Sequence, residues 1–156
     1  MKSPSFSMIQ REISQRLNET FHILHEIGYD LETCSVREFY DYMTGEIFSE
    51  DEITLKAVLE NKYLMIHEVV EISELKKMGL SIDTRVIVDS RKEVIYSAHL
   101  YAMDFELCCI QSDNDHEWLK KRIDAHYRVL TSDPWLPVSL KPRAQEIWDK
   151  FKHYTA

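Results

Sequence analysis

The chain has very few residues that break helices, and most of them lie near its end. Only 3 glycines and 4 prolines occur among 156 residues, and Pro134, Pro137 and Pro142 all lie in the last quarter. Proline interrupts a helix because it lacks a backbone N–H, and sheet proteins need glycine and proline for their turns. The body of the chain can therefore form long helices, and we predict an all-α fold.

Apolar residues recur at helical spacing in several segments. The clearest start signals are two capping boxes, Ser35–Glu38 and Ser49–Glu52, and the clearest stop signals are Gly28 and Gly79. The predicted helices cover residues 8–27, 35–43, 49–78, 81 or 83 to 110, 113–130 and a last segment from 141. The β-branched residues of 84–89 also allow a short strand. We expect a bundle of five or six helices with two long central antiparallel helices.

Length favours a single helical domain over residues 1–156. Within it, residues 1–7 are expected to be disordered. Residues 131–141 contain two of the prolines and are predicted to form a linker to the C-terminal helix.

Charge and cysteine usage restrict the partners and the compartment. The formal net charge of -8 repels phosphate backbones and anionic lipid, so nucleic acid and membranes are unexpected partners. No signal peptide and no run of about 18 apolar residues is present, which favours a cytoplasmic protein. Cys34 and the adjacent Cys108 and Cys109 are odd in number, and we expect reduced residues of the core.

Ionisable residues occur inside the two most apolar segments. His67, Glu68 and Glu71 lie within the apolar stretch 63–72, and His99 and Glu106 lie on one face of the next long helix. A buried charge is costly unless it is paired or coordinated. If the two helices are antiparallel neighbours, His67, Glu71, His99 and Glu106 can meet in one layer and bind manganese, iron, nickel or zinc. Glu68 is then a further ligand or a general base.

The same residues also admit a purely structural interpretation. His67 can be a core histidine that bonds to Glu71 one helical turn away. Glu60 and Glu74 then form a solvated edge with Lys56. His99 and Glu106 are then partly exposed. Glu60 is also a secondary candidate for the metal site, as is His25, which lies beside the apolar stripe of the first helix.

The order of these residues resembles a known family. His25, the pair His67–Glu68, Glu71 and Asp104 follow one another as do the site residues of HD-domain phosphohydrolases, with Glu68 where that family has aspartate. The resemblance covers only these helices and implies metal-dependent hydrolysis of phosphate esters, with Asp104 as a further ligand. The chain also resembles small all-helical proteins of archaea, which implies no activity.

Two functions from different classes follow. The first is a metal-dependent hydrolase that acts on a phosphorylated or nucleotide-like small molecule, because a metal supplies both activated water and charge neutralisation. The alternative is a non-catalytic interaction module that associates with itself, since nearly every predicted helix has an apolar face. A homodimer is plausible in either case.

Overall fold

The structure is a computed structural model that describes residues 3–48 and 53–155. The described part contains eight α-helices, of which α5 is a single turn, two short 3₁₀ helices, and no strand. The all-α prediction is confirmed, and the eight helices replace the five or six expected because two of the long predicted helices are each interrupted.

The first two helices follow their sequence signals closely. Helix α1 (Phe6–Glu26) buries an apolar stripe that includes Leu17, and Gly28 follows it with a positive φ of 82°. Helix α2 (Val36–Thr44) begins with the predicted capping box, in which Ser35 and Glu38 each bond to the other's backbone N–H. Residues 1–2 lie outside the described part, whereas the hydroxyl of Tyr40 bonds to the carbonyl of Pro4 and holds the start of the chain against α2.

The predicted helix 49–78 is divided into α3 (Leu55–Leu59) and α4 (Lys62–Lys77). Its expected capping box, Ser49–Glu52, lies outside the described residues. Asn61 causes the interruption, because its side chain accepts hydrogen bonds from the N–H groups of Tyr63 and Leu64 and so caps a new helix. The apolar periodicity continues across this break, so it gave no sign of it.

Replacing Asn61 by alanine is expected to destabilise the protein by about 1 kcal/mol, since two N–H groups at the start of α4 lose their acceptor. Urea unfolding measures the change. Asn18→Ala is the matched control, because Asn18 is exposed within α1 and caps no helix. Equal stability of the two variants would show that the Asn61 cap contributes nothing.

The next predicted helix is also divided, into α5 (Val86–Asp89) and α6 (Lys92–Ser112), with an extended backbone at Ser90. The alternative strand at 84–89 is wrong. The N–H of Glu46, just after α2, donates a hydrogen bond to the carbonyl of Thr84. This long-range contact anchors the connection between α4 and α5.

The C-terminal part forms a pair of helices. Helix α7 (His116–Ser132) begins at its cap Asp115, and helix α8 (Lys141–Phe151) begins where the sequence predicts. The expected linker at 131–141 is shorter, because α7 continues to Ser132 and a 3₁₀ turn, η1 (Val138–Leu140), precedes α8. A second 3₁₀ turn, η2 (Lys152–Thr155), follows α8.

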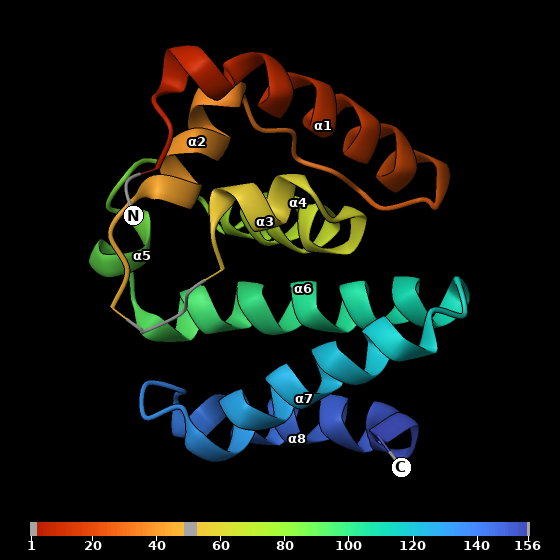
Figure 1. Ribbon diagram of the computed structural model, residues 1–156. Coiled ribbons are helices and arrows are strands. Elements are labelled where there is room, and N and C mark those ends of the chain that lie inside the picture. Colours follow the sequence, from red (N-terminus) through yellow and green to blue (C-terminus); the bar gives the residue numbers. More distant parts are fainter. Residues whose placement is uncertain (1–2, 49–52, 156) are drawn as a thin grey trace.

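Helices α4 and α6 form the centre of the fold, with α1, α2 and α3 on one side and α7 and α8 on the other (Figure 1). They are antiparallel, because Tyr63 at the start of α4 bonds to Asp113 at the end of α6, whereas Glu71 lies beside His99. Two long central antiparallel helices were predicted. The buried apolar side chains of α4 belong to one hydrophobic cluster of the core, and those of α6 contribute to both clusters.

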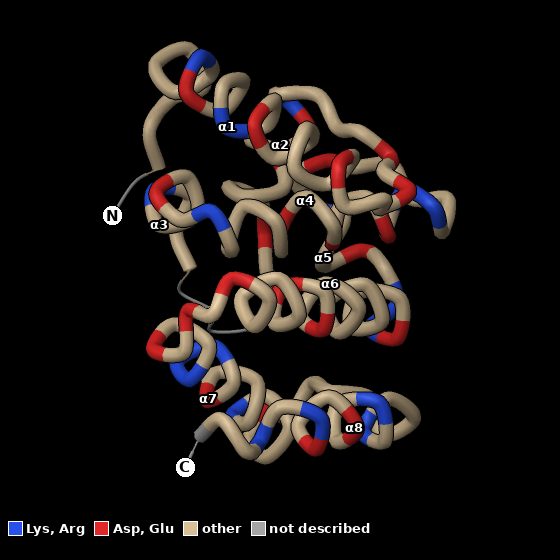
Figure 2. Tube along the Cα trace, turned by 90° about the vertical axis from the view of Figure 1, so that its right-hand side faces the viewer, with Lys and Arg blue, Asp and Glu red and all other residues tan. Residues whose placement is uncertain are grey.

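Charge is distributed unevenly along the chain (Figure 2). Residues 116–156 carry eight Lys or Arg and only five Asp or Glu, so the acidic excess of the protein lies in residues 1–115. None of the described helices is both long enough and apolar enough to cross a membrane.

Candidate metal centre

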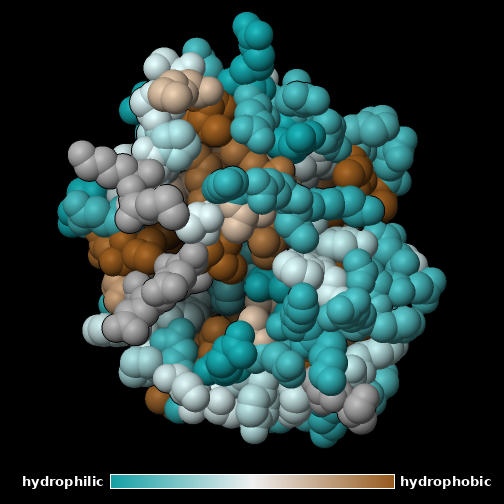
Figure 3. All heavy atoms as spheres, in the orientation of Figure 1, coloured by the Kyte–Doolittle hydropathy of each residue, from teal (hydrophilic) through white to brown (hydrophobic). Residues whose placement is uncertain are grey.

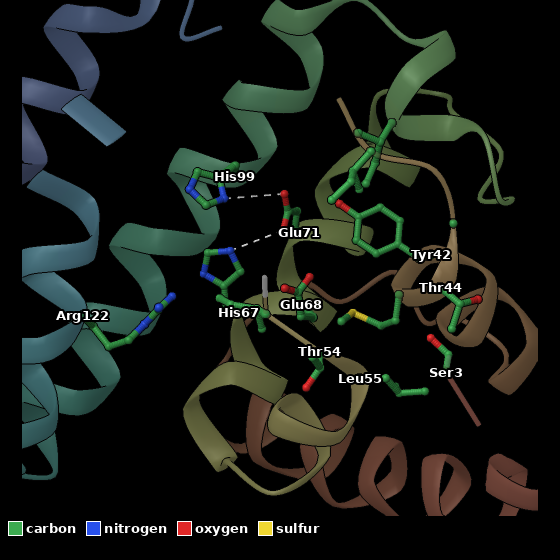
Figure 4. A pocket seen from close by; sticks show the side chains of 15 residues that line it. Ser3, Tyr42, Thr44, Thr54, Leu55, His67, Glu68, Glu71, His99 and Arg122 are labelled. Atoms are coloured by element: carbon green, nitrogen blue, oxygen red, sulfur yellow. Dashed lines mark ion pairs between the residues drawn. The ribbon is translucent and has the colours of Figure 1, made fainter. Parts of the chain in front are cut away.

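Facing positions on α4 and α6 bring three ionisable side chains together. His67 and Glu71 are one turn apart on α4 and only 3% and 6% exposed, and His99 projects from α6 toward them. Figure 4 shows the three side chains turned toward one another. The convergence of His67, Glu71 and His99 follows the prediction made from the sequence.

The separations between their polar atoms suit a metal ion. Nε2 of His67 lies 3.3 Å from Oε2 of Glu71, and Nδ1 of His99 lies 3.7 Å from Oε1 of Glu71. One ligand atom from each residue can be chosen so that all three lie within 4.8 Å of one another. Ligands about 2.1 Å from a tetrahedral ion are about 3.4 Å apart, and the two distances to Glu71 are close to that spacing.

Glu106 lies behind His67 rather than in this group. Its Oε1 accepts a 2.8 Å hydrogen bond from Nδ1 of His67, and its two oxygens accept bonds of 2.6 and 2.9 Å from Arg122 on α7. Since an ionised carboxylate only accepts hydrogen bonds, Nδ1 carries a proton toward Glu106, and Nε2 carries one toward Glu71 in the metal-free protein. A metal ion bound at Nε2 would displace that second proton. Glu106 was predicted to be a direct metal ligand. In this geometry it instead orients His67, which is one of the candidate ligands.

Arg122 is the member of this network that the sequence analysis missed. It is only 8% exposed and comes from a third helix, α7. A signal was present, because Arg122 lies between Leu119 and Ile123 on the side of α7 that packs into the core. An arginine on an apolar helix face predicts a buried carboxylate partner in the same way as the buried acids predict a cation.

The network shifts the pKa values of its members in opposite directions. Burial by itself would lower the pKa of His67, but hydrogen bonds to Glu106 and Glu71 outweigh it and raise that pKa to about 10. Burial would raise the pKa of both carboxyl groups. Hydrogen bonds with His67 and His99 instead hold the pKa of Glu71 well below its usual range, and the charge of Arg122 does the same for Glu106.

These shifts predict how the stability of the metal-free protein depends on pH. Because the pKa of His67 rises from 6.5 to about 10 on folding, its contribution is complete below pH 6.5 and is lost as the pH rises to about 10. The lowered pKa values of Glu71 and Glu106 have the reverse effect, and their contribution is lost as the pH falls below about 4.5.

Urea unfolding in the presence of a chelator should therefore show the free energy of unfolding falling by a few kcal/mol between pH 6.5 and 10. His67→Gln is the control, because it removes the titrating group and should reduce this fall. A fall of the same size in both proteins would mean that His67 does not carry the effect.

A cavity of about 430 Å³ opens beside the three residues. His67, Glu68, Glu71, His99 and Arg122 form its charged and imidazole wall, and hydroxyl and apolar side chains from other segments complete it. Glu68 points into the same space as the candidate ligands (Figure 4). The face of the molecule in Figure 3 is mostly hydrophilic, with apolar side chains visible in the hollow near its centre.

The remaining candidates lie away from this centre. His25 is exposed in the last turn of α1, and Glu60 is exposed at the end of α3. Asp104 bonds to Arg143 and Lys150 of α8, on the other side of α6. These three positions do not join the group formed by His67, Glu71 and His99, so a ligand order like that of the HD-domain enzymes is not assembled among the described residues.

The structural interpretation is also corrected in part. Glu106 is fully buried instead of partly exposed, and Glu74 bonds to Tyr29 and Lys77 instead of forming a solvated edge with Lys56. All three cysteines are free thiols, but only Cys34 is buried. Cys109 is half-buried and Cys108 is exposed, because they lie on other faces of α6 than the fully buried Leu107 and Ile110.

Comparison of the chain with protein families, with curated proteins and with solved structures found no match.

Proposed function

We propose that this protein binds a divalent metal ion and uses it to hydrolyse a small phosphorylated molecule. The observation that carries the proposal is the placement of Nε2 of His67, a carboxylate oxygen of Glu71 and a ring nitrogen of His99 around one point. Two imidazoles and one carboxylate are the protein ligands of many catalytic zinc sites, in which water occupies a further position. Manganese, iron and nickel accept the same donors.

The surroundings of this point support a catalytic ion. Glu106 and Arg122 orient His67 from behind, which fixes the ring nitrogen available to the metal. The open side of the group faces the cavity of about 430 Å³, which is large enough for a small molecule. A water molecule bound to the ion on that side would lie next to the substrate.

A phosphate group would need such an ion in this site. Glu68 and Glu71 line the cavity, so a phosphate would be repelled there without a compensating cation. A divalent ion neutralises this charge and lowers the pKa of its bound water. Glu68 would accept a proton from the attacking water as the new P–O bond forms. It would return that proton to the ester oxygen as the old P–O bond breaks, so that a neutral alcohol leaves.

Element analysis of the purified protein tests the metal centre. We expect about one equivalent of manganese, iron, nickel or zinc in the wild-type protein and a loss of more than tenfold in His67→Ala and His99→Ala, which each remove one of three ligands. His22→Ala is the matched control, because His22 is exposed on α1 and pairs only with Glu26.

A wild-type protein that takes up no metal after incubation with each of these ions would overturn the proposal. So would a protein that binds iron(II) and consumes oxygen but hydrolyses no phosphate ester, since two histidines and one carboxylate are also the ligands of iron oxygenases.

A further inference from the structure

A second cavity, of about 390 Å³, adjoins the candidate metal centre. It shares three lining residues with the first cavity, Ile53, His99 and Arg122, so the two spaces meet at one of the proposed metal ligands. From there it follows α7 toward its C-terminal end. We call this second space the side cavity.

The side cavity is apolar where it leaves His99. Met103 of α6 and Ala125 and Val129 of α7 line it beside Ile53. Its polar lining residues beyond Arg122 are Arg128, Ser132 and Asp133, near the end of α7. The carboxylate of Asp133 already accepts bonds from the hydroxyl of Tyr96 and the N–H of Trp135, so it is not directed at a ligand.

We infer that the side cavity binds the apolar part of the substrate whose phosphate group lies at the metal centre. This inference rests on the proposed function and names its substrate class, a phosphomonoester of an alcohol with an aliphatic or aromatic body. His99 borders both spaces, so a molecule whose apolar part lies in the side cavity can place its phosphate group beside the ion. The volume suits a group on the order of ten non-hydrogen atoms.

The reaction is then the transfer of the phosphoryl group from the alcohol to water. The new P–O bond would form with water, the bond between phosphorus and the alcohol oxygen would break, and that oxygen would take the proton held by Glu68 before the alcohol leaves from the side cavity. Burying the apolar body displaces water from Met103, Ala125 and Val129 and so favours longer chains.

The test measures binding of n-alkylphosphonates, which cannot be hydrolysed, to the zinc-loaded protein by calorimetry. From ethyl to octyl, we expect affinity to rise about three- to fourfold for each added methylene group. Ala125→Phe fills the side cavity and should abolish this dependence while leaving the affinity for methylphosphonate and for zinc unchanged. Ala57→Phe is the control, because Ala57 is also half-buried but lies on α3 and lines neither cavity.

The outcomes separate the two proposals. If the protein binds zinc but binds alkylphosphonates of every chain length with the same affinity, the side cavity is not a substrate site. The proposal of a metal centre would then remain. A chain-length dependence that survives in Ala125→Phe would also overturn it. A protein that binds no metal would overturn the proposed function, and the substrate class inferred from it would fall as well.

Discussion

Glu68→Gln is expected to lower the rate of phosphate-ester hydrolysis by the metal-loaded protein by about 10²- to 10⁴-fold. Glutamine keeps the size of Glu68 but cannot accept a proton from metal-bound water. Because Glu68 is outside the group of three proposed ligands, the variant should retain its metal. Steady-state kinetics with 4-nitrophenyl phosphate measure the rate, and element analysis measures the metal content.

Glu60→Gln is the matched control for this experiment. Glu60 is exposed at the end of α3 and lines neither cavity at the centre, so its variant should hydrolyse the ester at the wild-type rate. A Glu68→Gln protein that keeps both its metal and its full rate would exclude Glu68 as the base. One that loses its metal would instead make Glu68 a ligand.

Arg122→Met is expected to destabilise the protein by about 3–5 kcal/mol. Methionine preserves much of the volume of the side chain but removes the guanidinium group, which bonds to both oxygens of Glu106. Glu106 is fully buried and would keep a charge that only His67 compensates. Urea unfolding of the metal-free variant at pH 6 measures the loss.

Removing both charges separates this cause from a simple loss of packing. In the double variant Arg122→Met with Glu106→Leu, no carboxylate is left buried without a cation, so we expect part of the stability to return. Arg128→Met is the control on the same helix, since Arg128 is exposed. If the double variant is less stable than Arg122→Met, the pair stabilises the fold by something other than charge compensation.

Most helices were predictable because their signals are local. The capping box Ser35–Glu38, the stop at Gly28 and the start near Lys141 each depend on residues within one or two turns, and the structure confirms them. The interruptions at Asn61 and Ser90 were not predicted. The apolar periodicity continues through the first, and neither glycine nor proline marks the second, where the backbone of Ser90 is extended.

The candidate centre was also predictable only in part. Ionisable residues in the most apolar segments indicated that His67, Glu71 and His99 belong inside, and their helical spacing placed them on facing sides of α4 and α6. The sequence did not show that Glu106 bonds to the other ring nitrogen of His67, because helical periodicity assigns a face but not the distance between two side chains.

The sequence by itself determined the fold class, most helix positions and the burial of His67 and Glu71, because periodicity and capping act over a few residues. Only the tertiary structure decided which of the acids faces the cavity, which one orients His67, and that Arg122 of α7 compensates its charge. Those outcomes depend on how three helices pack against one another, and packing is set by side chains distant in the chain.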